Sequence, residues 1–183
     1  MHTRNRATKA AIAAFGMAVG AAVLGAARDA RAATDGQHGM QASQTRQAEV
    51  ARKGATVMPF DLTRTTHFFD DLKTGGVETV SANDKTDSGQ IRLVRAHLSA
   101  EAKRFSHGDF SDPAKIHGEN MPGLAELSHA GAKLRVKYKS LPAGASLTYS
   151  SRDEVVVAAI HEWFAAQRSD HMAHMHMHDD GSM

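Results

Sequence analysis

The chain carries the same series of secondary-structure signals twice. In each half, two short segments with alternating apolar and polar residues are joined by a glycine-containing turn, and a longer segment with apolar residues at helical spacing follows. Alternation is typical of a half-buried strand, and spacings of three and four are typical of an amphipathic helix. The predicted elements are residues 65–72, 77–82 and 90–105 in the first half, and residues 133–139, 146–150 and 153–168 in the second.

The two halves align with fixed offsets. An offset of 69 matches Leu72 with Leu141, and an offset of 64 matches His97 with His161. A single hairpin is marginally stable in water, whereas two ββα units can pair into one sheet and bury a common face. We therefore predict an α+β domain in which duplicated ββα units form a four-stranded antiparallel sheet with helices on one face.

The N-terminal segment predicts export. Three basic residues lie within the first nine, an apolar stretch rich in alanine and glycine follows at residues 10–27, and Ala30-Arg31-Ala32 fits a small-x-small cleavage site. This is the layout of a signal peptide, so we expect residues 1–32 to be removed and the protein to be periplasmic or secreted. A membrane anchor is the alternative, but the stretch is only weakly hydrophobic.

The remaining chain divides into three predicted parts. Residues 33–55 are polar and read as a flexible leader, residues 56–170 form the α+β domain, and residues 171–183 form a tail rich in histidine and methionine. A segment with few apolar residues cannot bury enough surface to offset the entropy of ordering it.

Charge and cysteine content exclude several classes of function. The chain has 22 basic and 20 acidic residues, and residues 1–32 hold five of the basic and one of the acidic ones, so cleavage leaves a net charge of −2. The cleaved chain has no excess of basic residues, so we do not expect nucleic acid as a partner. We also expect no association with a membrane after cleavage. The absence of cysteine excludes disulfides and thiolate metal sites, so an exported domain depends on its own core.

The C-terminal tail alternates histidine with methionine. Its candidate ligands are His171, Met172, His174, Met175, His176, Met177 and His178. Imidazole nitrogen and thioether sulfur together suit copper, and the sulfur atoms favour Cu(I). We predict a copper-binding tail, with another divalent metal as the alternative cargo. A tag without native function is the other interpretation, although tags are usually uniform histidine runs.

A second group of candidate metal ligands lies in the predicted domain. Its members are His97, His107, Asp109, His117 and His161. Three of them belong to a segment, residues 106–123, in which glycine and proline could fold imidazoles and carboxylates around a divalent ion. His97 and His161 have equivalent positions in the two halves, so a pseudo-twofold axis could bring them to one site. The structural alternative is that these residues only cap turns or make local hydrogen bonds.

Several motifs resemble a family of small, mostly uncharacterised bacterial proteins whose members often carry the name aspartate carbamoyltransferase. These motifs are Met58-Pro59-Phe60, Thr66-His67-Phe68, Gly108-Asp109-Phe110-Ser111-Asp112-Pro113, Ile116-His117-Gly118, Met121-Pro122-Gly123-Leu124 and His161-Glu162-Trp163-Phe164. The resemblance covers about residues 56–171. It implies a common fold and brings no established catalytic residues with it.

The residues do not favour the activity in that name. Residues 62–66 look like the carbamoyl-phosphate loop of transcarbamoylases, Ser-Thr-Arg-Thr-Arg, but Leu62 replaces its serine and Thr66 its final arginine. Transcarbamoylases are also much longer and have two α/β domains. A hydrolase in which a divalent ion activates water remains an alternative, as does non-covalent haem bound by His97 or His161.

We therefore expect an exported metal-binding protein that acts in copper buffering, scavenging or resistance through its tail. Its partners would be the metal ion and another periplasmic metal-handling protein. The alternative is a small periplasmic enzyme or ligand-binding protein, haem-binding included, whose tail is incidental. If a chain without the tail still binds copper, the histidines of the domain, including His67, are the next residues to mutate.

Overall fold

The structure is a computed structural model that describes residues 22–171, with side chains from residue 40 onward. The chain forms two compact units that meet at Gln41 and Ala42. The strands are β1 (Thr65–Leu72), β2 (Gly75–Ala82), β3 (Arg135–Leu141) and β4 (Gly144–Ser150). The helices are α1 (Ala22–Val57), α2 (Ser88–Phe105), α3 (Ser111–His117), α4 (Leu124–His129) and α5 (Glu154–His171), with 3-10 turns at Leu62–Arg64 and Gly131–Lys133.

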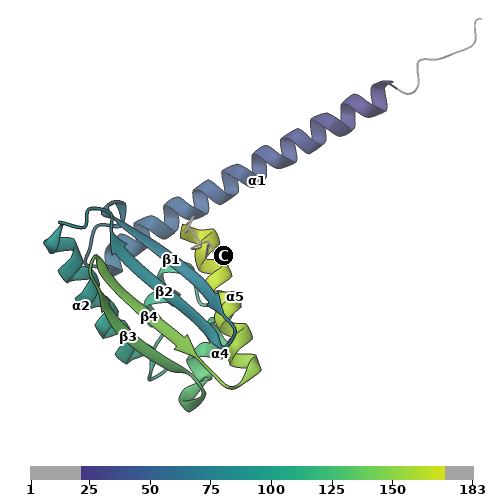
Figure 1. The fold of residues 1–183 in the computed structure, drawn as a ribbon. Helices are drawn as coiled ribbons and strands as arrows, with labels where there is room; N and C mark the ends of the chain where they lie inside the picture. Colours follow the sequence, from purple (N-terminus) through teal and green to yellow (C-terminus); the bar gives the residue numbers. More distant parts are fainter. Residues whose placement is uncertain (1–21, 172–183) are drawn as a thin grey trace, which may run out of the picture. The chain divides into compact units, whose positions relative to one another are not determined.

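The four strands form one antiparallel sheet in the order β1-β2-β4-β3 (Figure 1), which confirms the predicted fold class. Leu72 pairs with Gly75 in the first hairpin and Leu141 with Gly144 in the second, so both hairpins have the same register at an offset of 69. The inner strands of the two hairpins pair with each other, and an 18-residue helix follows each hairpin.

Helices α2 and α5 cover one face of the sheet and enclose the core. Val94 and Leu98 of α2 and Ile160 and Phe164 of α5 are fully or almost fully buried there. Gly76 of β2 allows the close approach of α5, because a Cβ atom at this position would lie 2.4 Å from the Phe164 ring. A side chain there would force the helix away from the sheet.

The N-terminal boundary of the domain differs from the prediction. Residues 33–55 are not a flexible leader but part of helix α1, and from Ala42 onward this helix belongs to the same compact unit as the sheet. Val50 is buried, and Arg46 forms an ion pair with Asp170 of α5. The polar composition hid the helix because a buried valine and the polar contacts of Arg46 and Gln47 attach it, rather than an apolar stripe.

The signal peptide and the tail fall largely outside the described residues. Residues 1–21 of the predicted signal peptide and residues 172–183 of the predicted tail are in these parts, so both remain predictions. Within residues 22–171, no helix combines the length and the apolar character that crossing a membrane requires.

The segment between the halves is more helical than predicted. Residues 111–117, within the segment that was predicted to fold around a metal ion, form helix α3, and residues 124–129 form α4. Phe110, Pro113 and Ile116 are buried at this short helix, and the Phe110 ring lies against Trp163 of α5 with ring centroids 5.7 Å apart. Seven residues are too few to show a helical period in the sequence.

Candidate functional site

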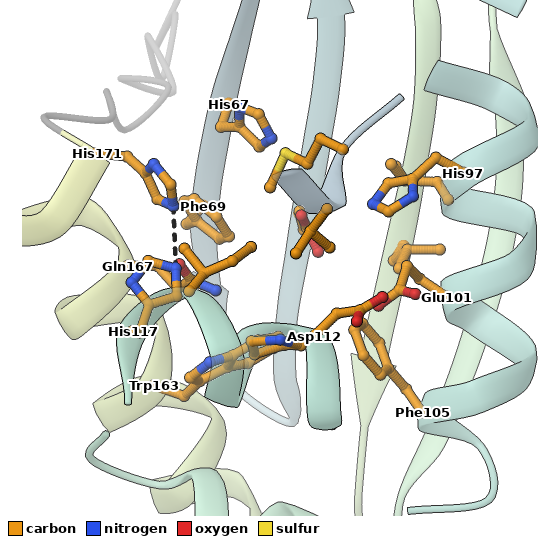
Figure 2. A pocket seen from close by; sticks show the side chains of 17 residues that line it. His67, Phe69, His97, Glu101, Phe105, Asp112, His117, Trp163, Gln167 and His171 are labelled. Atoms are coloured by element: carbon orange, nitrogen blue, oxygen red, sulfur yellow. Dashed lines mark hydrogen bonds between the residues drawn. The ribbon is translucent and has the colours of Figure 1, made fainter. Parts of the chain in front are cut away.

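A cavity of about 40 Å³ lies between the sheet and helices α2, α3 and α5. Figure 2 shows His67, His117 and His171 on one side of it and His97, Glu101 and Asp112 on the other. The apolar part of the wall consists mainly of Phe69, Leu98, Phe105, Ile116, Leu147 and Trp163. One water needs at least about 10–15 Å³ of such space, so the cavity admits an ion with a few water-sized ligands but no haem.

A carboxylate fixes the orientation of His117. This histidine is the last residue of α3 and is buried, and its Nδ1 lies 2.7 Å from Oδ2 of Asp170. Arg46 holds Asp170 from the other side, with Nε 3.0 Å from Oδ1 and Nη2 2.6 Å from Oδ2. Burial raises the pKa of Asp170, but these hydrogen bonds outweigh it and keep the pKa below its ordinary value.

Since the carboxylate is ionised, Nδ1 of His117 carries the hydrogen that it donates to Asp170. In the neutral ring, Nε2 then has a lone pair. This lone pair accepts a hydrogen bond from Nε2–H of His171, the last residue of α5, at 3.2 Å, dashed in Figure 2; a bound metal ion would replace that hydrogen. His67 stacks on His171 with ring centroids 5.5 Å apart and an interplanar angle of 9°.

Burial keeps this histidine cluster neutral. Burial, together with the neighbouring imidazoles, lowers the pKa of His67 to about 3 and that of His171 to about 4. Burial also lowers the pKa of His117, although Asp170 opposes the shift. Neutral imidazoles are metal ligands, so protons compete little for these nitrogens at neutral pH.

The separation of His117 and His171 fits two ligands of one metal ion. Metal–nitrogen bonds of about 2.0–2.1 Å at a tetrahedral angle place the two nitrogens about 3.3 Å apart. A carboxylate on the second nitrogen, as Asp170 provides, is the usual support of a metal-bound histidine. Within residues 22–171, no group of three or more ligand side chains is close enough to hold an ion alone, so this pair would need further ligands to bind one.

The opposite side of the cavity is acidic. Arg104 donates to Oε1 of Glu101 at 2.8 Å and also pairs with Asp112. Burial raises the pKa of Glu101 to about 7 despite the nearby Arg104. Burial likewise raises the pKa of Glu78 to about 7, and its Oε2 accepts a hydrogen bond from the Tyr149 hydroxyl at 2.8 Å.

The structure brings together some of the predicted ligands and separates others. His97, His117 and His171 line the cavity. His107 is exposed and bonds the carbonyl of Lys103 through Nδ1 at 2.7 Å, and Asp109 pairs with Arg104. The segment at residues 106–123 therefore brings His117 to the cavity but not His107 or Asp109.

His161 does not share a site with His97. Its Nε2 lies 3.0 Å from the carbonyl oxygen of Leu72 and 2.9 Å from that of Gly75, so it secures the turn of the first hairpin. The symmetry of the two halves extends to the strands and helices but not to the roles of these histidines. The predicted tail ligands from Met172 to His178 lie outside the described residues.

Several residues of the cavity and its supports were absent from the predicted site, among them Trp163 and Gln167. Asp170 was not considered, and His67 appeared only as a residue for later mutation. One pattern in the sequence could have indicated this cavity. Trp163, Gln167 and His171 follow one another at intervals of four, which puts them on one face of a helix. All three line the cavity.

No protein-family model matches the chain, and neither the curated proteins nor the solved structures contain a match.

Proposed function

We propose that this protein is an exported metal-binding protein that holds a copper ion at His117 and His171. The observation that carries the proposal is the 3.2 Å separation of their Nε2 atoms, with Asp170 holding the other nitrogen of His117. Both rings lie in a cavity with an apolar wall, where burial keeps them neutral.

The sequence that follows His171 supports copper over zinc. Met172 is the next residue, and histidine and methionine alternate up to His178. Zinc sites use thiolate, imidazole and carboxylate ligands, whereas thioethers favour Cu(I), and copper leads the divalent affinity order. In this proposal the tail captures ions at weaker sites and passes them to the histidine pair in the cavity.

The test is the copper content of purified variants after competition with a chelator of known affinity. His117→Gln should lose the most tightly bound copper, while a chain that ends at His171 should keep it and lose the weaker copper of the tail. His129→Gln is the matched control, because His129 is exposed and its Nδ1 bonds the Ala125 carbonyl at 2.7 Å, far from this chemistry. Full retention of tight copper by His117→Gln would refute the proposal.

One observation favours a second candidate, a small metal-dependent hydrolase. Glu101 lines the same cavity and has a pKa near 7, which suits a general acid or base. A screen of the metal-loaded protein against activated esters and phosphoesters tests this function. Glu101→Gln should abolish any turnover while the copper content stays unchanged; turnover that survives this substitution excludes Glu101 as the acid or base.

A further inference from the structure

Two buried polar atoms beside the histidine pair have no hydrogen-bond partner within the described part of the chain. They are Nε1 of Trp163 and Oε1 of Gln167. The two residues are 1% and 6% exposed, and Figure 2 shows both at the cavity. Buried polar groups are nearly always paired, so two orphaned atoms lining one cavity indicate a missing ligand.

The two atoms define the hydrogen bonding of that ligand. An indole Nε1–H only donates, and an amide oxygen only accepts. A single ligand that satisfies both atoms accepts a bond from Trp163 and donates one to Gln167, which an O–H group does and a simple anion or an ammonium ion does not. The cavity volume of about 40 Å³ limits it to a few non-hydrogen atoms.

We propose that Trp163 and Gln167 hold a water or hydroxide bound to the metal as an exchangeable ligand. One lone pair of its oxygen coordinates the ion, another accepts the Trp163 hydrogen, and one O–H donates to Gln167. The inference rests on the proposed metal site at His117 and His171, and it makes that site an open one, which small molecules can enter by displacing the water.

Azide tests this arrangement because it coordinates a metal and accepts hydrogen bonds but cannot donate one to Gln167. The full-length chain is loaded with Co(II), whose visible spectrum reports its ligands, and is titrated with azide. The same titration of His117→Gln gives the signal of cobalt bound elsewhere, which is subtracted. His129→Gln serves as the control for an unrelated histidine.

The two α5 residues should shift azide binding in opposite directions. Gln167→Leu should tighten it about fivefold, since the acceptor that favours water over azide is lost. Replacing the tryptophan by its benzothiophene analogue removes the N–H while keeping the shape. It should weaken azide binding by up to about tenfold, because the N–H bonds the azide anion more strongly than the neutral water that azide displaces. The chain has one tryptophan, so this replacement changes no other site. Trp163→Phe also removes the N–H donor, so it allows the same test without incorporating the analogue.

The outcomes separate this inference from the function on which it rests. If cobalt binds in a His117-dependent manner but azide does not displace a ligand, or both replacements shift azide binding in the same direction, the inference is overturned and the metal site stands. If the cobalt spectrum is independent of His117, the proposed function itself is overturned.

Discussion

Replacing Glu78 by glutamine should stabilise the metal-free protein at pH 7 and above and leave its stability unchanged near pH 4.5. Burial raises the pKa of Glu78 from its ordinary value of 4.5 to about 7, and the hydrogen bond from Tyr149 offsets only part of this shift. Glutamine can accept the same hydrogen bond through its amide oxygen. The substitution therefore removes the titration with little change in shape.

The magnitude follows from proton linkage. Below pH 4.5 the carboxyl is protonated in both states, and between pH 4.5 and 7 only the unfolded chain releases its proton, so the stability falls as the pH rises. Each pH unit between the two pKa values corresponds to about 1.4 kcal/mol. Between pH 4.5 and 7 the ionisation of Glu78 thus lowers the free energy of unfolding by about 3 kcal/mol. This figure is an upper bound because the Glu78 side chain is only half-buried.

Urea unfolding in the presence of a chelator, followed by the fluorescence of Trp163, measures this effect from pH 4.5 to pH 8. The difference between Glu78→Gln and the wild type isolates Glu78, because the buried histidines titrate in both proteins. The same substitution at the exposed Glu119 is the control, and its curve should run parallel to the wild-type curve. A constant difference between Glu78→Gln and the wild type across the range would refute the burial argument.

Three further predictions concern the metal site and the packing. Copper binding that depends on His117 should persist down to about pH 5, since burial lowers the pKa of His171 to about 4, whereas binding by free imidazoles falls below about pH 6.5; equilibrium dialysis across this range distinguishes them. Asp170→Asn should weaken copper binding about 10- to 100-fold in chelator competition, and an unchanged affinity would remove Asp170 from the site. Gly123→Ala should destabilise the fold by at least about 2 kcal/mol in thermal unfolding, because φ is +74° and a Cβ atom would lie 2.1 Å from a backbone oxygen of α5. Gly131→Ala is the control, because φ is also positive there but no atom lies within 4 Å of the added Cβ; it should lower the free energy of unfolding by less. Equal losses of stability in the two variants would contradict the steric argument.

The sheet and its long helices were predictable because each repeats a local period over enough residues. The strand at residues 65–72 was predicted to the residue, and the other strands and the two 18-residue helices within a few residues of their ends. These elements carry the alternating or helical spacing of apolar residues that burial on one face demands. The equal offset of the two hairpins followed from the same patterns.

The candidate site was only partly predictable because it depends on contacts between distant residues. His117 and Asp170 are 53 positions apart and meet only when α3 packs against the end of α5. Arg46, which completes this arrangement, belongs to a helix whose polar sequence gives no periodic signal. The equivalent positions of His97 and His161 in the two halves, by contrast, suggested one shared site. In the structure His97 lines the cavity, whereas His161 bonds the turn of the first hairpin.

The position of His171 at the end of α5 has a consequence for how ions move. The last predicted tail ligand, His178, is seven residues away, a reach of at most about 25 Å. An ion held by the tail, as proposed above, would thus be tethered to the cavity at an effective concentration in the millimolar range. Transfer between the tail and His117 would be intramolecular, so its rate should not depend on the protein concentration, and an ion could pass inward without release to the surrounding solution.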